Sequence, residues 1–246
     1  MRTIWVLGDQ LNTDLGALAG ADVATDRILM VESAAKMASK RWHRQRAHLV
    51  LTAMRRFAAE LAEAGFTVDF RWAESLEAGL GAHVAEHRPS TVMATEPASW
   101  EGRRLLERLG VDLVRSNQFL CHYEEFAEWA RGRARLTMED FYRWQRRRLG
   151  YLMEIDGAGE AQPVTGRWNY DADNRRPPPR DHRDRWPAPP SSRLDAIDRA
   201  VLADIGPACW GDDPDGTWAT AGAQPWRDCA TSSTRSCRRS GPTRTP

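Results

Sequence analysis

The sequence predicts an α/β protein with an open, parallel, five-stranded sheet that carries helices on both faces. Two observations lead to this fold class. Short apolar runs rich in β-forming residues recur through the first half of the chain, and most end at a glycine or a polar residue. Segments with helical periodicity alternate with these runs, and such alternation requires parallel strands joined by right-handed crossovers. The predicted strands are Ile4–Leu7, Arg27–Ser33, Thr67–Trp72, Thr91–Thr95 and Val111–Val114.

The first predicted strand leads directly into a candidate binding site. Its apolar run is cut off by Gly8, Asp9 and Gln10. In open α/β sheets ligands lie outside the carboxyl ends of the strands, so these three residues are candidates for contact with a bound molecule. The alternative is that Gly8 allows a tight turn and that Asp9 caps the next segment of the chain.

The longest predicted helix runs from Trp42 to Ala64, with Gly65 as its C-cap. Its apolar residues recur at helical spacing and form one stripe, which comprises Val50, Met54, Phe57, Ala58 and Leu61. Its other face carries Arg44, Arg46, Arg55 and Arg56. The remaining predicted helices are Ser75–Arg88, Trp100–Gly110, Glu124–Arg131, Thr137–Leu149 and Ser192–Ile205.

These elements predict three regions. Residues 1–120 form the α/β domain, residues 121–228 a helical and proline-rich linker region, and residues 229–246 a tail. Prolines crowd the stretch from Gly157 to Pro190, which predicts an irregular connection. The tail has neither acidic nor large apolar residues, so it is predicted to be disordered.

Composition points to a soluble cytoplasmic protein. The net charge of +1 gives no global attraction to nucleic acid or to a membrane surface. No stretch reaches the about 18 apolar residues of a membrane-spanning helix, and the amino terminus lacks the pattern of a secretory signal. The sparse cysteines predict reduced thiols rather than a disulfide framework, and they are Cys121, Cys209, Cys229 and Cys237.

Several common chemistries have no signature in the chain. There is no glycine-rich phosphate loop and no dinucleotide fingerprint after the first strand, which argues against P-loop enzymes and ordinary nicotinamide-dependent dehydrogenases. We also find no metal-ligand spacing. His43 and His48 fall on different faces of a helix, and the Cys121-His122 pair has no second pair to complete a zinc site.

Charged residues at predicted element ends are further candidates. Glu32 and Glu96 fall at strand ends, where they can share a crevice with Asp9 and hydrogen-bond a polar ring or a ribityl chain, or can simply cap helices. The helix that starts at Thr137 has a basic end, formed by Arg143, Arg146, Arg147 and Arg148. These arginines can contact phosphates or form a solvated face, and Trp144 among them can stack on a base or pack inward with Phe141.

Five stretches in order match motifs of one known family: Leu7–Leu11, Thr52–Ala58, Thr95–Pro97 with Trp100, Leu136–Tyr142 and Gly166–Arg175. Together they resemble the photolyase-related proteins of bacteria, the iron–sulfur branch of the photolyase/cryptochrome family. The last stretch is the most specific, because a string so rich in Trp, Asn and Asp is rare by chance. The resemblance covers Met1 to Thr220.

The resemblance implies a Rossmann-like antenna domain that can hold a light-harvesting chromophore of the lumazine or deazaflavin type. In the family a linker then leads to a helical domain that binds FAD and a 4Fe–4S cluster. Light-driven electron transfer from reduced FAD repairs pyrimidine photoproducts in DNA, or signals in cryptochrome-like members.

The resemblance also assigns site residues. Positions of the family's antenna site are occupied by Gly8, Asp9, Gln10, Glu32 and His43. Lys36 stands where an acidic residue that contacts a lumazine is expected, so a different chromophore or an empty site also fits. Asp171 is assigned to a contact with the helical domain or with a cation.

We therefore expect the chain to be the amino-terminal portion of a light-dependent DNA-repair or blue-light-signalling flavoprotein. The FAD helices, the cluster cysteines and the lesion-facing residues would follow, so we expect a chain that is not catalytic by itself and does not bind DNA tightly. Residues Ser240–Pro246 are what codons for Phe-Gly-Pro-Tyr-Glu-Asp-Ala encode when they are read one base late, which suggests a frameshift.

Two other functions remain as alternatives. The first is a small nucleotide-binding α/β protein of the adenine-nucleotide hydrolase type. A phosphate loop after the first strand would favour it, but Gly8-Asp9-Gln10 is too short to surround phosphates. The second is a nucleic-acid module that presents the arginines between Arg143 and Arg148, against which the low net charge speaks.

Overall fold

The computed structural model describes residues 1–170, 191–206 and 209–220. These residues fall into two compact units, which we describe separately. Unit 1 comprises the described residues of Met1–Gln118 and Pro187–Pro246, and unit 2 those of Phe119–Trp186. Among the described residues, no helix combines the length and the apolar character that crossing a membrane requires. Asp171 and the predicted tail 229–246 lie outside these residues, as do Cys229 and Cys237.

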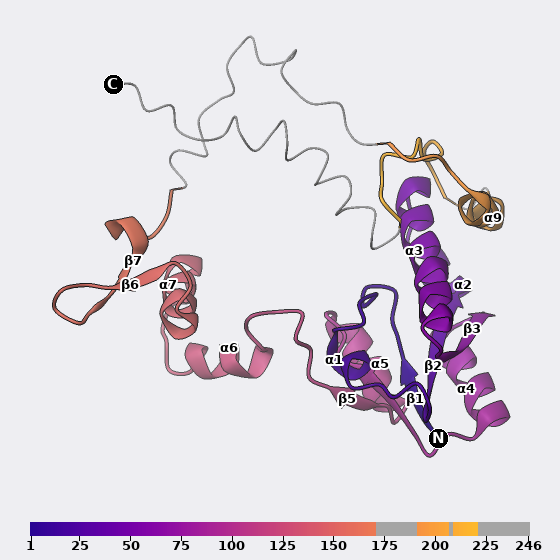
Figure 1. The fold of residues 1–246 in the computed structure, drawn as a ribbon, viewed down its shortest axis with the longest axis horizontal. Helices are drawn as coiled ribbons and strands as arrows, with labels where there is room; N and C mark the ends of the chain where they lie inside the picture. The colour runs from indigo at the N-terminus through magenta and orange to yellow at the C-terminus, as the bar shows by residue number, and fades with distance from the viewer. Residues whose placement is uncertain (171–190, 207–208, 221–246) are drawn as a thin grey trace, which may run out of the picture. The chain divides into compact units, whose positions relative to one another are not determined.

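Unit 1 contains the five-stranded parallel sheet that the sequence predicts (Figure 1). Its strands lie in the order β3-β2-β1-β4-β5. They are β1 (Arg2–Trp5), β2 (Asp26–Ser33), β3 (Thr67–Ala73), β4 (Thr91–Thr95) and β5 (Asp112–Val114). The direction of winding reverses between β1 and β4, so loops diverge at the carboxyl end of β1 and leave room for a ligand there.

Helices cover both faces of this sheet, which confirms the predicted fold class. On one face Ile4 and Ile28 pack against α1 (Gly16–Ala19) and α3 (Arg44–Glu63), which contributes Phe57. On the other face Trp5 and Leu29 pack against α4 (Leu76–His87) and α5 (Trp100–Arg108). Neighbouring residues of β1 and β2 therefore pack into the cores on opposite faces of the sheet. Because both faces are buried, both strands have continuous apolar sequences.

Two short helices of unit 1 have no counterpart in the sequence prediction. They are α1 and α2 (Ala34–Ala38), which follows β2 directly. Both span barely one turn, too little for an apolar stripe to repeat. Ser33 caps α2 by accepting a hydrogen bond from the Lys36 amide at 3.2 Å, so the end of β2 turns at once into a helix.

A later segment of the chain returns to unit 1. Helix α9 (Ala196–Ile205) packs on α3, with Val201 fully buried and Ile205 against Ala47 and Leu51. Polar contacts surround this apolar seam, and Arg56 of α3 donates to Asp198 of α9 at 2.9 Å. The sequence prediction groups this helix with the linker region 121–228, whereas its contacts lie with the α/β unit.

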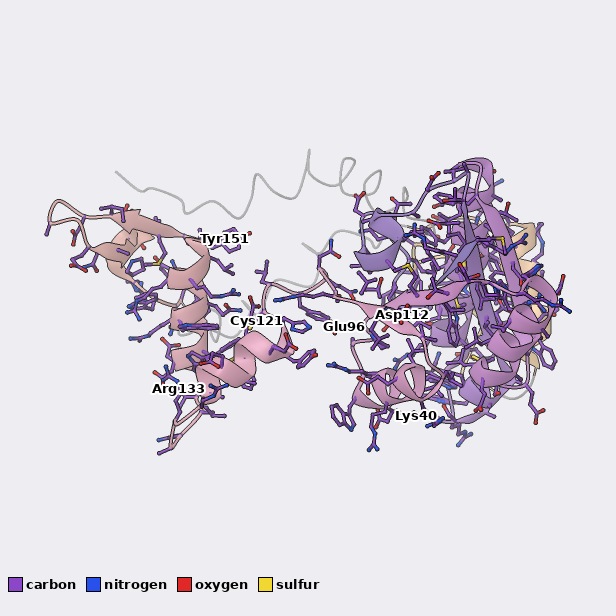
Figure 2. All side chains as sticks on the ribbon, turned by 90° about the horizontal axis from the view of Figure 1, so that it is seen from below. Lys40, Glu96, Asp112, Cys121, Arg133 and Tyr151 are labelled. Carbon is purple, nitrogen blue, oxygen red and sulfur yellow. The ribbon has the colours of Figure 1, made fainter. Side chains whose placement is uncertain are left out.

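Unit 2 is built around aromatic side chains of α6 (Tyr123–Ala130) and α7 (Met138–Leu149). Trp129 packs with Phe141 at a ring separation of 5.1 Å, and Trp144 lies 5.7 Å from Phe141. Trp144 thus packs inward, as one of the two predicted alternatives has it. Arg133 covers the Trp129 ring at 4.6 Å. Figure 2 labels Arg133 and Tyr151 among the side chains of this unit. An unpredicted hairpin, β6 (Met153–Ile155) and β7 (Ala161–Pro163), followed by the single turn η1 (Val164–Gly166), completes the unit.

Candidate functional site

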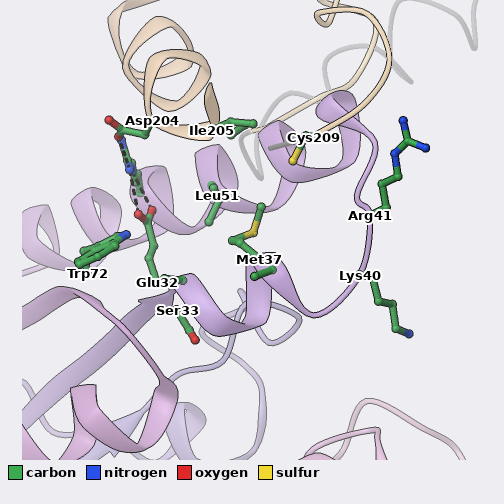
Figure 3. Close-up of a pocket in the computed structure, with 13 residues that line it drawn as sticks. Glu32, Ser33, Met37, Lys40, Arg41, Leu51, Trp72, Asp204, Ile205 and Cys209 are labelled. Atoms are coloured by element: carbon green, nitrogen blue, oxygen red, sulfur yellow. Dashed lines mark hydrogen bonds and ion pairs between the residues drawn. The ribbon is translucent and has the colours of Figure 1, made fainter. Parts of the chain in front are cut away.

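A pocket of about 540 Å³ opens at the carboxyl end of β2, between α2, α3 and α9 (Figure 3). Its lining combines apolar side chains with a few charged ones and includes Glu32, Ser33, Met37, Leu51, Asp204 and Ile205. Volumes of this order are typical of small-molecule sites in proteins. We call this cavity the β2 pocket.

An ion-pair network fixes one side of the β2 pocket. Arg55 of α3 donates to both carboxylate oxygens of Glu32 at 2.8 Å and also to Asp204 of α9 at 2.7 Å. The hydrogen bonds from Arg55 to Glu32 raise the pKa of the guanidinium above its ordinary value. Because Glu32 is only 5% exposed, this bidentate pair is a fixed, charged feature of the pocket rather than a helix cap.

A second hollow of about 530 Å³ lies on the other side of the Arg55–Glu32 pair, between β3 and α3. It shares Glu32, Arg55 and Trp72 with the β2 pocket. Its remaining lining is apolar and consists of Ala58, Ala59, Val68 and Phe70, which we call the apolar shelf. Figure 3 shows the Trp72 ring beside Glu32 at the edge of the site.

The three candidates that follow β1 take different positions. Gly8 lies against α3, where an added Cβ atom would stand 2.9 Å from the Met54 sulfur, so a larger residue here would require the Met54 side chain to shift. Gln10 is buried and donates to the Thr95 and Glu96 carbonyl oxygens at 3.0 and 3.3 Å. Asp9 is exposed. Asp9 and Gln10 line a separate pocket of about 440 Å³ at the β1/β4 switch point.

The three acidic candidates take separate positions: Glu32 lines the β2 pocket, Asp9 lines the pocket at the β1/β4 switch point, and Glu96 lines neither. Strand β2 continues beyond its last register pair with β1, Trp5 with Leu29, and in this part Glu32 pairs with Trp72 of β3. Gln10 meanwhile holds that turn toward β4. The Glu96 carboxylate accepts from the Ser116 amide at 3.3 Å and lies 4.0 Å from the Arg103 guanidinium.

Lys36 and His43 are not among the residues that line the β2 pocket. Lys36 is exposed on α2, and its carbonyl oxygen accepts from the Trp42 indole at 3.2 Å. His43 caps α3 by accepting from the Gln45 amide at 3.2 Å, and its ring packs edge-on against Trp210 at 4.6 Å. Both residues shape the start of α3 next to the pocket.

Sequence reasoning misses the residues that do most to build the pocket. The sequence places Arg55 on the polar face of its helix, and its partner Asp204 lies 149 positions farther along the chain. No local periodicity can report such a contact. Trp72 belongs to a strand that is predicted to be half exposed, and its position at the end of that strand is the only available signal.

A group of potential metal ligands also escapes sequence reasoning. Asp69 of β3 and His83 and His87 of α4 place their ligand atoms within 4.8 Å of one another. His83 is fully buried between Thr3 and Asp69, at 2.8 and 2.6 Å. Arg71 donates to Asp69 at 2.6 Å, so a guanidinium already supplies the positive charge at this cluster. We assign the group as a structural network that ties α4 to the sheet.

Residues 4–210 match the family model described as deoxyribodipyrimidine photo-lyase-related protein. A protein of Agrobacterium fabrum named (6-4) photolyase is 37% identical over 189 residues, which is 72% of this chain and 36% of that protein. The chain thus spans little more than a third of the length of the relative that it matches.

Proposed function

The chain belongs to the deoxyribodipyrimidine photo-lyase-related family, and on this premise we propose that unit 1 is an antenna domain. The β2 pocket is the place that we propose for its light-harvesting chromophore. The observation that carries this proposal is a pocket of about 540 Å³ whose apolar walls enclose a fixed, charged Arg55–Glu32 pair.

The chemistry of the pocket suits a planar heterocycle of the lumazine or deazaflavin type. Met37, Leu51 and Ile205 offer apolar contact to the ring, while Ser33 and the Arg55–Glu32 pair offer hydrogen bonds to a polar edge. Such a chromophore, when bound, absorbs near-ultraviolet or blue light and passes the excitation energy on. The protein's part is to bind it, orient it and exclude water.

In this proposal one of the predicted site residues contacts the chromophore, and others support the elements around the pocket. Glu32 contacts the chromophore directly, whereas Gly8 and His43 position α3 and Gln10 holds the turn after β1. Lys36 is exposed outside the lining, so the basic residue at this position leaves the pocket open to a ligand.

The activity of the whole protein is a wider proposal, supported by the family and by the name of the Agrobacterium relative. We place the protein in light-dependent repair of DNA photoproducts in the cytoplasm, with blue-light signalling as the second candidate. FAD and a 4Fe–4S cluster are the cofactors of that chemistry in the family. Unit 1 then harvests light and is not itself catalytic.

The test is an absorption spectrum of the protein purified from its own host. We expect a near-ultraviolet or blue band without flavin fine structure. Ala34→Trp places a large ring in the β2 pocket and should abolish the band, whereas Ala35→Trp on the neighbouring exposed position should keep it. A protein without any such band, or a band that survives Ala34→Trp, would contradict the proposed site.

A further inference from the structure

We propose that Trp72 is a ligand-stacking residue of the antenna site and that the bound ring extends past the Arg55–Glu32 pair onto the apolar shelf. The inference rests on the proposed antenna function. It adds a binding residue and a second lobe to the β2 pocket, and it restricts the class of ligand that the site takes.

Trp72 is an exposed aromatic side chain at the end of β3, next to the proposed site. Side chains alternate along β3, so Trp72 shares the α3 face of the sheet with Val68 and Phe70. The latter two pack against the core beneath α3, whereas Trp72 is 74% exposed. Leaving an indole in water forgoes most of the free energy that its burial would provide. Trp72 is thus a large aromatic surface that lies beside the proposed ligand.

The β2 pocket and the hollow over the apolar shelf share part of their lining. Glu32, Arg55 and Trp72 border both the β2 pocket and the hollow over the apolar shelf. Figure 3 shows the Trp72 ring next to Glu32, on the side of the pocket away from Met37 and Cys209. Because Trp72 borders both hollows, a flat ring that stacks on its indole lies next to both of them.

The lining of the two hollows defines the ligand class. Glu32 and Arg55 offer hydrogen bonds at the border of the two hollows, and Ser33 adds a further group on the β2 side. Beyond this border the shelf side offers hydrocarbon from Ala58, Ala59, Val68 and Phe70. The complementary ligand is a fused planar heterocycle with one hydrogen-bonding edge and one hydrocarbon edge. Its face provides the area for offset stacking on Trp72.

The first experiment titrates the full chain with a ribityl lumazine and, separately, with riboflavin, and follows the induced circular dichroism of the ring. Trp72→Ala should raise Kd about tenfold, and Trp72→Phe should stay within about threefold because it keeps a stacking face. The matched control is Trp100→Ala, which removes another exposed tryptophan, 69% exposed at the start of α5.

The second experiment blocks the shelf. Ala59→Phe fills the shelf lining and should weaken binding, whereas Ala62→Phe makes the same change at an exposed position of α3 outside that lining. Equal affinities of Trp72→Ala, Ala59→Phe and wild type would overturn the stacking proposal and leave the antenna proposal intact. Wild-type protein that binds neither probe would overturn both.

Discussion

Arg55 shows how one side chain couples distant parts of the molecule. It pairs with the nearly buried Glu32 at the end of β2 and with Asp204 on α9. The energetics of such a pair are asymmetric, because removal of one partner leaves the other buried without compensation. Arg55 is therefore both a stabilising residue and part of the proposed site.

Arg55→Met should lower the free energy of unfolding by about 3 kcal/mol, because it strands the Glu32 carboxylate. Chemical denaturation provides the measurement. Arg46→Met, an exposed arginine of the same helix that covers the Trp42 ring, should cost about 1 kcal/mol or less. The double variant Glu32→Gln/Arg55→Met should recover part of the loss, and no recovery would argue against a direct pair.

Two buried histidines should make stability depend on pH. Burial lowers the pKa of His48, against the opposing effect of Asp198, and burial likewise lowers the pKa of His83 against Asp69. The unfolded chain then binds more protons than the native protein below the ordinary histidine pKa of 6.5. The stabilising contribution is complete above pH 6.5 and is lost as the pH falls toward the native-state pKa values.

We therefore expect the free energy of unfolding to be lower at pH 5.5 than at pH 7.5, with a smaller difference in His83→Gln. Asp195, whose pKa the Arg56 hydrogen bond lowers to about 2, stays ionised throughout this window and does not contribute to the difference. Denaturant midpoints at the two pH values provide the measurement. Greater stability at pH 5.5 would show that the histidines are protonated in the native state.

Helix α7 has the predicted bounds, with Thr137 as its N-cap and Gly150 as its C-cap, but one arginine at its basic end has an unpredicted role. The predicted alternatives for its basic end are a phosphate-binding surface and a solvated face. Arg146 is instead buried and donates to the carbonyl oxygens of Tyr151, Leu152 and Trp168, which joins the helix to the segments that precede β6 and follow η1. Arg147 lies over the Trp168 ring at 4.6 Å.

Arg146→Met should destabilise unit 2, because it leaves several carbonyl oxygens without their donor. We expect faster cleavage between α7 and β7 in limited proteolysis, by about tenfold or more, with the spectrum of any bound chromophore unchanged. Arg147→Met, an exposed neighbour, is the matched control. Equal cleavage rates for the two variants would contradict the structural role of Arg146.

The elements that the sequence predicts are long enough to show a repeating pattern of apolar residues. Strands β1, β2 and β4 and helix α3 carry their signal in local patterns of apolar residues, and these patterns hold in the structure. Helices α1 and α2 and the hairpin β6–β7 are too short to show a period. The site is harder to predict, because Arg55, Trp72 and Asp204 meet only through tertiary packing, for which a single sequence holds no local signal.

For the molecule as a whole, the proposed chromophore should stabilise elements that are far apart in the chain. Residues of β2, α2, α3 and α9 line the same pocket. A ligand that binds only when the pocket is intact lowers the population of every locally unfolded state in which one of these elements has left the pocket. This coupling is a direct consequence of α9 returning to unit 1.

Hydrogen exchange of the purified protein, before and after removal of the chromophore, tests this expectation. Amides of α9 should be protected more strongly in the loaded protein, by about tenfold or more, because Asp204 and Ile205 line the pocket. Amides of α4, on the opposite face of the sheet, should change little. Unchanged α9 protection with increased α2 protection would show that the ligand sits away from α9.

The position of α9 in the chain also bears on biosynthesis. The ribosome makes the sheet and α3 first, then all of unit 2, and only later the residues that form the last wall of the β2 pocket. Amino-terminal domains fold while synthesis continues, so the nascent sheet exists for a time with this side of the pocket open to solvent. On the proposed function, we expect the chromophore to be loaded late in synthesis, only after α9 has left the ribosome.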